Sequence, residues 1–447
     1  MLSQTDNQTI SRIGPGTPMG ALFRQYWLPA LLSSELPNPD SDPVRVLILG
    51  EKLIAFRDTN GAVGLIQNHC PHRGASLFFG RNEEAGLRCV YHGWKFDVTG
   101  QCVDMPNEPA ESNFKNKVKA TAYPTCERNG IVWAYMGPRA TPPPLPDFEA
   151  NQLPEGEYAV QGMIRDCNWL QALEGDIDTS HLAFLHHGGN RAEDAAPGSF
   201  LYYTLADRRP KFEALDTDYG VMSGAYRPVG EDQRYWRIAQ YLFPCFVMIP
   251  SGVLGLQIWT RAWVPMDDQH CMFFGMQQRN LMALRRPAGT AAPNQASLPR
   301  TGGMRYLPNG TDWLSRHRVV QHADNDYLID RDLQRSNQGF NGYTGIVGVV
   351  QDTMVTESMG PIWNRSQEHL GTTDAMIIRV RKRLLDAARA LESNGLTPPG
   401  VDNPEVYRVR GGGVMLPADA DWVTATEHLR PAFVPHPEID PALSGGA

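Results

Sequence analysis

Short runs of Val, Ile and Leu separated by turn residues dominate the first third of the chain and predict β-strands. Two of the connections, Gly50-Glu51 and Asp58 to Gly61, are typical of hairpins because Gly and Asn tolerate the positive φ of tight turns. A short helix is expected before them, at Met19–Tyr26. The expected strands are Val44–Leu49, Lys52–Arg57, Ala62–Gln67, Lys95–Asp97 and Gly130–Tyr135, with Cys89–Tyr91 also extended.

Beyond residue 157 the pattern mixes two periods. Apolar residues at helical spacing predict helices over Asn168–His187 and Thr373–Asn394. Strands are expected at Tyr158–Ile164, Phe212–Asp218, Val221–Tyr226, Trp236–Phe243, Leu256–Val264 and Cys271–Gln278. This part is therefore predicted to be α+β, whereas the first part is all-β.

One apolar stretch could be mistaken for a membrane span. Tyr241–Trp259 contains nineteen residues without a charge. Because two prolines and two glycines interrupt its middle, we interpret it as two buried strands joined by a turn. Two segments rich in small residues and proline, 284–303 and 431–447, are expected to be a mobile loop and a fraying tail.

A proline-rich segment divides the chain, since five of the nine residues 138–146 are proline. We expect an N-terminal arm, a first domain, a linker, a second domain and a tail. Their expected bounds are 1–26, 27–137, 138–157, 158–430 and 431–447.

Composition narrows the possible partners and location. The net charge is −8 at pH 7 and no polybasic run is present, which argues against nucleic acid or an anionic membrane as a partner. The first ten residues lack the basic and apolar regions of a signal peptide, so a cytoplasmic protein is expected. The seven cysteines are an odd number without the dense spacing of a secreted scaffold, which favours ligands and buried thiols over disulfides.

Two cysteines and two histidines form the first chemical motif. Cys70 and His72 are followed, after sixteen residues, by Cys89 and His92. Two thiolates and two imidazoles can hold a zinc ion or a two-iron cluster with mixed ligation. Structural zinc usually takes paired cysteine knuckles, whereas each loop here offers one Cys and one His. The spacing therefore favours the cluster.

Two histidines and several acids within the predicted helix at 168–187 form a second motif. Two imidazoles and one carboxylate on one face of an iron leave positions open for O2. His181 and His186 are five residues apart, so both reach one metal only if the helix ends or bulges between them. Asp178 lies one turn before His181 and can contact the other nitrogen of its ring.

The segments Cys70-Pro-His-Arg-Gly74 and Cys89-Val-Tyr-His-Gly-Trp94 resemble the Rieske [2Fe–2S] motif. Together with the second motif, they make the chain similar to the oxygenase (α) component of Rieske non-haem iron ring-hydroxylating oxygenases, closest to the phthalate 4,5-dioxygenase branch. The resemblance extends from Gly14 to the helix near Leu385 and includes Gln351-Asp352. It implies an all-β Rieske domain followed by a catalytic domain of helix-grip type, with an antiparallel sheet and helices.

Carried over residue by residue, the resemblance implies that Cys70, His72, Cys89 and His92 bind the cluster. His181, His186 and Asp352 would bind a mononuclear Fe(II). Asp178 would be the catalytic residue that connects this iron to the Rieske histidines of a neighbouring subunit. The alternatives for the iron ligands are His187, Asp176 and Glu357.

The resemblance also implies partners. The expected assembly is a homotrimer or a stacked hexamer, with O2 as co-substrate. The chain has no dinucleotide fingerprint and no plant-ferredoxin cysteine run, so NAD(P)H would act only indirectly, through a separate flavin and [2Fe–2S] reductase.

The predicted substrate is an aromatic carboxylic acid, converted by phthalate-like cis-dihydroxylation. Arginines that bind its carboxylate are expected among Arg208 or Arg209 and Arg237, with Thr179 also facing the pocket. The alternative enzyme is a Rieske monooxygenase or O-demethylase of methoxy- or phenoxybenzoates. A Rieske electron carrier and a zinc-stapled binding protein are the alternatives outside this class.

Overall fold

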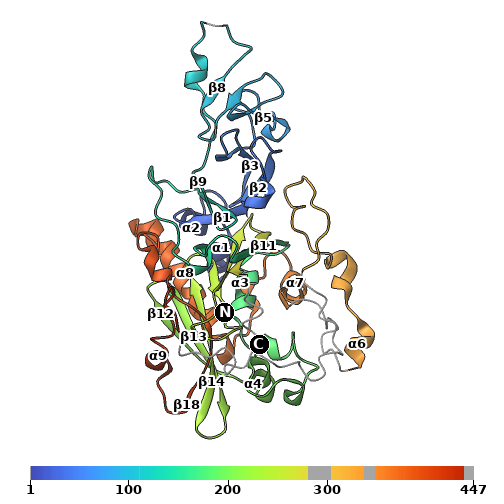
Figure 1. Ribbon diagram of the computed structural model, residues 1–447, viewed down its shortest axis with the longest axis vertical. Coiled ribbons are helices and arrows are strands. Elements are labelled where there is room, and N and C mark those ends of the chain that lie inside the picture. Colours follow the sequence, from blue (N-terminus) through green and yellow to red (C-terminus); the bar gives the residue numbers. More distant parts are fainter. Residues whose placement is uncertain (1, 110, 280–303, 337–347, 437–447) are drawn as a thin grey trace.

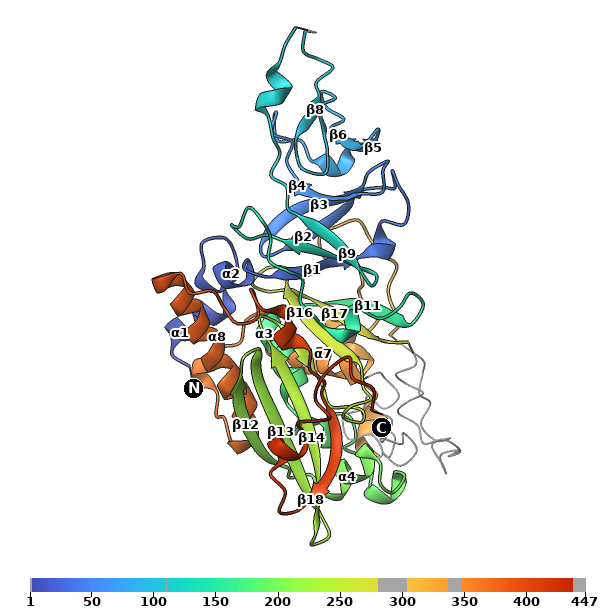
Figure 2. The same ribbon diagram turned by 60° about the vertical axis from the view of Figure 1, so that its left-hand side comes forward.

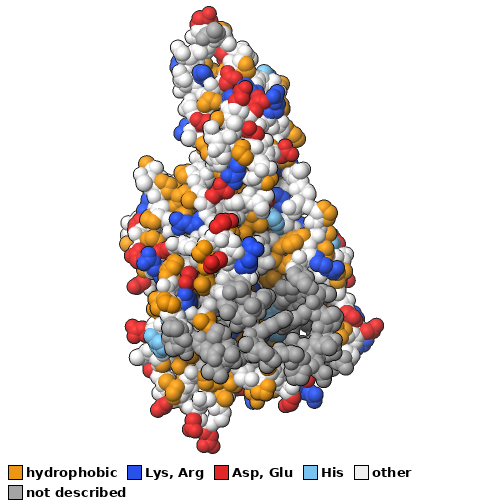
Figure 3. All heavy atoms as spheres, viewed as in Figure 1, with side chains coloured by type: hydrophobic (Ala, Val, Ile, Leu, Met, Phe, Trp, Pro, Cys, Tyr) orange, Lys and Arg blue, Asp and Glu red, His pale blue; other side chains and the backbone are white. Residues whose placement is uncertain are grey.

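A computed structural model describes residues 2–109, 111–279, 304–336 and 348–436. It consists of a narrow N-terminal β-unit that projects from a broader α+β body (Figures 1 and 3). This architecture confirms the predicted fold class. None of the helices in the described ranges is long and apolar enough to cross a membrane.

The N-terminal unit contains three small antiparallel sheets. Their strand orders are β1-β10-β9, β2-β3-β4 and β5-β6-β7-β8. The strands are β1 (Trp27–Leu32), β2 (Val44–Ile48), β3 (Glu51–Arg57), β4 (Val63–Gln67), β5 (Arg81–Glu83), β6 (Gly86–Arg88), β7 (Lys95–Phe96), β8 (Cys102–Asp104), β9 (Thr125–Arg128) and β10 (Ile131–Tyr135). The predicted hairpins are confirmed, and their turn residues Gly50 and Gly61 both have positive φ, of 78° and 86°.

The body is built on one antiparallel sheet, with the order β11-β17-β16-β15-β14-β13-β12 and β18 paired to β14. Its strands are β11 (Tyr158–Arg165), β12 (Lys211–Thr217), β13 (Gly220–Val229), β14 (Gln233–Leu242), β15 (Phe246–Met248), β16 (Trp259–Pro265), β17 (Cys271–Gln278) and β18 (Gly412–Pro417). The uncharged stretch Tyr241–Trp259 supplies the end of β14, all of β15 and the start of β16, so the two predicted strands are present and an unpredicted short strand, β15, lies between them.

The described helices surround this sheet. They are α1 (Gln4–Ser11), α2 (Pro18–Phe23), α3 (Trp169–Ile177), α4 (Phe200–Ala206), α6 (Arg331–Arg335), α7 (Gly348–Ser358), α8 (Ala375–Asn394) and α9 (Trp422–Ala425). The long helix α8 packs on β12, β13 and α2 (Figure 2), and its apolar stripe is buried as its period predicts.

Several sequence expectations fail or lie outside the description. The helix predicted over 168–187 is wrong in length, because α3 ends at Ile177. Helices α1, α4, α6, α7 and α9 and strands β1, β5, β6, β8, β9, β15 and β18 were not predicted. The segment Cys89–Tyr91, expected to be extended, forms a loop. Residues 284–303 lie outside the described residues, as does most of the tail at 431–447.

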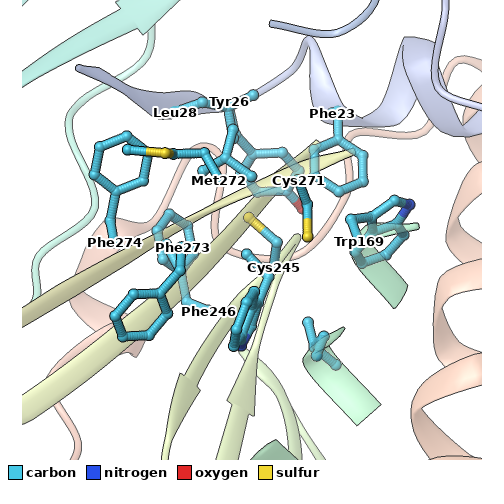
Figure 4. Close-up of a cluster of buried hydrophobic side chains, with 14 of the residues drawn as sticks. Phe23, Tyr26, Leu28, Trp169, Cys245, Phe246, Cys271, Met272, Phe273 and Phe274 are labelled. Carbon is cyan, nitrogen blue, oxygen red and sulfur yellow. The ribbon is translucent and has the colours of Figure 1, made fainter. Parts of the chain in front are cut away.

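The hydrophobic core is continuous between the two units. Phe23, Tyr26 and Leu28 pack in the same buried cluster as Cys245 and Phe274 of the body (Figure 4). Backbone hydrogen bonds join the units too, from Leu49 N–H to the Pro265 carbonyl (3.0 Å) and from Gly50 N–H to the Met266 carbonyl (2.8 Å). The N-terminal unit is therefore held on the body by shared burial.

A second connection comes from residues 304–319, which we call the strap. The strap returns from the body to the N-terminal unit, where Arg316 pairs with the buried Glu35 and His317 Nε2 lies 3.3 Å from the same carboxylate. Arg45 donates to the Thr311 carbonyl. Burial alone would raise the pKa of Glu35, but Arg316 and His317 outweigh it and lower the pKa to about 2.

Replacing one partner of this buried pair tests the strap. Arg316→Met is expected to lower the thermal midpoint by roughly 3–5 °C at pH 7. The carboxylate left without its partner costs about 3–5 kcal/mol, and in a chain of this length each kcal/mol shifts the midpoint by only about 1 °C. The native pair contributes fully above the unfolded pKa of Glu, about 4.3, and its contribution is lost as the pH falls toward 2. In Arg316→Met burial raises the pKa of Glu35 instead, so the carboxylate is more readily protonated. The stability lost relative to wild type therefore becomes smaller as the pH is lowered from 7 to 5.

Scanning calorimetry at the two pH values measures this effect. The control is the double variant Glu35→Gln/Arg316→Met, which should recover most of the lost midpoint because no buried charge remains. An Arg316→Met midpoint equal to wild type at pH 7 would contradict the role assigned to the strap.

Candidate metal centres

Two short loops at the projecting end of the N-terminal unit carry the first motif. Residues 70–74 follow β4 and residues 89–94 connect β6 to β7. Each loop closes with the same turn, from Gly74 N–H to the Cys70 carbonyl (2.9 Å) and from Gly93 N–H to the Cys89 carbonyl (3.0 Å). Both glycines have positive φ, of 78° and 76°. The Cys-x-His segment at 70–72 and the Cys-x-x-His segment at 89–92 therefore fold into two loops closed by the same kind of turn.

The four side chains of the motif lie together. Cys70 and Cys89 are buried, and burial together with the neighbouring Cys89 raises the pKa of the Cys70 thiol to about 11. The ring centroids of His72 and His92 are 4.4 Å apart. Nδ1 of His72 is buried and has no hydrogen-bond partner among the described residues. Two adjacent sulfurs and an unsatisfied imidazole nitrogen fit the donor set of a [2Fe–2S] cluster with mixed ligation.

Neighbouring side chains fix the loops. The Trp94 ring stacks on His72 with centroids 4.3 Å apart and donates to Asn107 (2.9 Å). Arg88 donates to the Gly93 carbonyl (2.8 Å) and pairs with Asp104. Val90 and Tyr91, within the second loop, are more than half exposed, so an accessible apolar pair lies at the motif.

The second motif lies at the end of helix α3. The Asp178 carboxylate accepts hydrogen bonds from the Ser180 N–H and hydroxyl, both at 2.7 Å, and this local turn replaces a continued helix. His181 begins a short 3-10 turn, and His186 follows it. Because the helix ends before both histidines, their Nε2 atoms approach to 3.1 Å.

Asp352 comes to these histidines from α7. Its Oδ1 lies 3.3 Å from His186 Nε2 and 3.5 Å from His181 Nε2. The ligand atoms of these three residues lie within 4.8 Å of one another, close enough for all three to hold one metal ion. Burial works to raise the pKa of Asp352, but the two histidines outweigh it and keep the pKa well below its ordinary value. Two imidazoles and an ionised carboxylate fit a non-haem iron and leave other positions open.

A buried arginine positions α7. Arg165 is fully buried, donates to the Val349 carbonyl at the start of α7 (2.8 Å) and lies over the Trp263 ring at 4.4 Å. Gln351, next to Asp352, holds the other nitrogen of His186, with Oε1 3.1 Å from Nδ1. Sequence reasoning missed Arg165, which directly follows the predicted strand Tyr158–Ile164 and belongs to no motif.

The alternative iron ligands are engaged elsewhere. The Asp176 carboxylate accepts from Arg261 and from Trp263 (2.6 Å), and the Glu357 carboxylate accepts from the Asp166 N–H (2.8 Å) and the Tyr327 hydroxyl (2.7 Å). His187 does not belong to the three-residue group.

The predicted electron-transfer and substrate residues lie around the same group. Asp178 Oδ2 is 3.6 Å from His181 Nδ1. Arg237 is buried and donates to the Thr179 hydroxyl (2.9 Å). Arg208 donates to the Ala183 (2.7 Å) and Asn190 (2.6 Å) carbonyls and so closes the loop that carries His186. Arg209, by contrast, is exposed at the surface.

Comparison with known proteins gives the chain a family context. Residues 26–123 match the Rieske [2Fe-2S] domain and residues 134–429 match the model described as "LigXa C-terminal domain like". The oxygenase subunit of 3-chlorobenzoate-3,4-dioxygenase from Comamonas testosteroni is 47% identical over 94% of this chain and 97% of the relative. The oxygenase subunit of phthalate 4,5-dioxygenase from Pseudomonas putida is 35% identical over 94% of each chain.

More distant relatives differ in chemistry. The oxygenase subunit of 5,5'-dehydrodivanillate O-demethylase from Sphingobium is 31% identical over 86% of this chain and 80% of the relative. Among solved structures, dicamba monooxygenase aligns with a TM-score of 0.54 at 19% identity, covering 83% of this chain and 98% of that one. At this level of identity, the structural likeness shows a shared fold only.

Metal analysis of purified variants tests the two donor sets. We expect Asp352→Asn to lose one iron per chain and to retain the acid-labile sulfide, because a buried carboxylate ligand is removed while the cluster loops stay intact. Cys89→Ser should lose the sulfide and the visible absorption of the cluster.

Glu357→Gln is the matched control on the same helix and should keep the full iron content. If iron falls in Glu357→Gln and not in Asp352→Asn, the assignment of the carboxylate ligand is wrong.

Proposed function

The chain belongs to the Rieske non-haem iron oxygenases, and we propose that it is the terminal oxygenase of a system that dihydroxylates an aromatic carboxylic acid. The observation that carries the substrate class is the pair of relatives matched over 94% of this chain, both named for dioxygenation of aromatic acids. A buried arginine beside the iron-binding group, Arg237, supports it.

The two centres have separate tasks. When bound, the [2Fe–2S] cluster supplies single electrons and the iron supplies O2 activation. Residues 27–137 would form the domain that holds the cluster, through Cys70, His72, Cys89 and His92. Residues 158–430 would form the domain in which His181, His186 and Asp352 hold the iron. Buried Arg165 keeps α7, and with it Asp352, against the histidines.

Electron transfer is proposed to cross between subunits of a homotrimer. The cluster loops lie in the projecting unit, whereas α3 and α7 lie in the body (Figure 1), so the two centres of one chain are well separated. Exposed Val90 and Tyr91 beside the cluster loops would dock on a neighbouring chain, next to Asp178. Asp178 would then hold His181 on one side and a partner's cluster histidine on the other.

Electrons would come from a separate reductase that carries a flavin and a [2Fe–2S] cluster. The relatives that match over most of the chain are named as oxygenase subunits, which is how proteins of multicomponent systems are described.

Substrate placement is assigned to the wall formed by Thr179 and Arg237. Arg237 is 2% exposed and burial lowers its pKa to about 9, so its charge needs an anion nearby. Arg208 holds the loop of His186 by donating to backbone carbonyls. Arg209 is exposed and is the less suitable of the two for binding a substrate carboxylate.

A second candidate is monooxygenation or O-demethylation of a methoxy- or phenoxybenzoate. The observation that favours it is the O-demethylase subunit matched at 31% identity. One iron centre can serve either outcome, because the position of the substrate decides which bond receives oxygen.

Product analysis tests the proposed reaction. The purified oxygenase, loaded with Fe(II) and supplied with a phthalate-type reductase, NADH and O2, is incubated with phthalate, 3-chlorobenzoate, methoxybenzoates and phenoxybenzoates. We expect a product that has gained both oxygen atoms as a cis-diol, detected by mass spectrometry with ¹⁸O2. A single added oxygen or a lost methyl group would instead establish the second candidate, and peroxide without product would remove both.

Replacing Asp178 tests the electron path. Asp178→Asn is expected to keep both metal centres but to slow coupled turnover by at least about 100-fold, because the carboxylate that holds His181 is neutralised. The control is Asp194→Asn, an acidic residue in a nearby turn, which should leave turnover unchanged. Single-turnover reoxidation of the prereduced cluster, followed by absorption, would show no slowing if Asp178 has no part in the path.

A further inference from the structure

Two arginines lie side by side on the sheet of the body. Arg227 on β13 is opposite Tyr235 of β14, and Arg237 on β14 is opposite Ala225 of β13. Paired residues of an antiparallel sheet share a face, so both arginines lie on one face as diagonal neighbours. Both are buried, with exposed fractions of 1% and 2%. Among the described residues, neither forms an ion pair.

The two guanidinium groups differ in what they already bind. Arg237 donates to the Pro250 carbonyl through Nε and Nη2 (3.2 Å each) and to Thr179 through Nη1 (2.9 Å). Arg227 donates only through Nε, to the Asp207 carbonyl (2.7 Å). Its Nη1 and Nη2 are shielded from solvent and have no hydrogen-bond partner among the described residues. The whole outer fork of Arg227 is therefore unused.

An unused fork in this position is costly for the free protein. A buried charged donor without a partner pays its full desolvation penalty, and the neighbouring like charge adds repulsion. Burial lowers the pKa of Arg227 to about 10 and that of Arg237 to about 9, and Arg227 contributes to the second shift. A carboxylate would satisfy both nitrogens of the fork at once, since its two oxygens match their spacing.

The surroundings suit an aromatic acid and connect to the iron-binding group. The Phe200 ring lies over Arg237, 4.5 Å from its guanidinium carbon, and Tyr203 stacks on Tyr235 at 4.6 Å. Arg237 donates a hydrogen bond to Thr179, and Thr179 directly follows Asp178 in the sequence. Phe200 and Tyr203 belong to α4 and are only half-buried, so this short helix is the cover that must yield when a ligand enters.

We propose that Arg227 is the carboxylate clamp of the substrate site, with Arg237 as the second cation and α4 as the cover. The assignment rests on the proposed oxidation of aromatic acids and deepens it, by naming the residue that makes a negative charge on the substrate a requirement. The outer fork of Arg227 accepts the carboxylate in a bidentate manner, and a neutral isostere such as a benzamide leaves the fork unsatisfied.

Ligand binding to the complete, metal-loaded oxygenase tests the clamp. Benzoate, 3-chlorobenzoate, phthalate and benzamide are titrated by calorimetry into wild type, Arg227→Met and Arg227→Lys. The control is Arg234→Met, since Arg234 on the neighbouring strand β14 stacks on Tyr226 and is less buried than Arg227. Cluster absorption and iron content verify that each variant is folded and loaded.

Arg227→Met should weaken binding of the acids on the order of 100-fold, while benzamide binds equally weakly to both proteins. Arg227→Lys should be intermediate, because a lysine keeps the charge but not the fork. KM for the acid should rise more than kcat falls. Without ligand, Arg227→Met should have a thermal midpoint equal to or above wild type, since an unpaired buried charge is removed; a purely structural arginine would lower it.

The outcomes separate the clamp from the proposed function. If wild type binds and converts the acids and Arg227→Met binds them equally well, the clamp is wrong and the proposed function stands. If wild type neither binds nor converts any of the acids, the proposed function fails and the clamp fails with it. A midpoint several degrees below wild type together with unchanged acid binding would also overturn the clamp.

Discussion

The catalytic half of the molecule depends on one contact, the approach of the buried Asp352 carboxylate to His181 and His186. The three residues come from two segments far apart in the chain, and two local features bring them together. The Asp178 carboxylate accepts a hydrogen bond from the Ser180 N–H at the end of helix α3, and the turn that follows brings the two histidines side by side. Arg165 holds the first turn of α7, which carries Asp352. A cation bound by all three residues would then satisfy the buried carboxylate between the two imidazoles.

The N-terminal unit is constrained differently, because its loops would have to hold a cluster and still be accessible to a partner protein. Two matching turns place Cys70 and Cys89 inward, while Val90 and Tyr91 remain exposed. The unit is fixed on the body by a shared core and by the pair of Glu35 with Arg316. We therefore propose that electrons pass between subunits from a cluster unit that is held in a fixed position on its body.

Sequence reasoning predicted the family better than the individual helices and strands. The hairpins around Gly50 and Gly61 and the stripe of α8 are local patterns, so they could be read directly. Helix α3 was predicted too long because Leu182 and Leu185 continue its apolar period, whereas the turn at Asp178 competes with the helix. Arg165 and Arg227 carry no local signal, since their role comes from strands and helices that meet only in the folded chain. The motif around Asp352 was informative even though helix α7 was not predicted.

The most direct test of the account is a mixed assembly of two inactive variants, Cys89→Ser without a cluster and Asp352→Asn without the iron. If electrons cross between neighbouring chains, random trimers of the two should recover about a quarter of wild-type turnover, because each mixed ring contains one productive interface. Each variant alone should be inactive. Mixed assemblies as inactive as the separate variants, with trimers verified by native mass spectrometry, would contradict transfer between subunits and with it the role of Asp178 as the bridge.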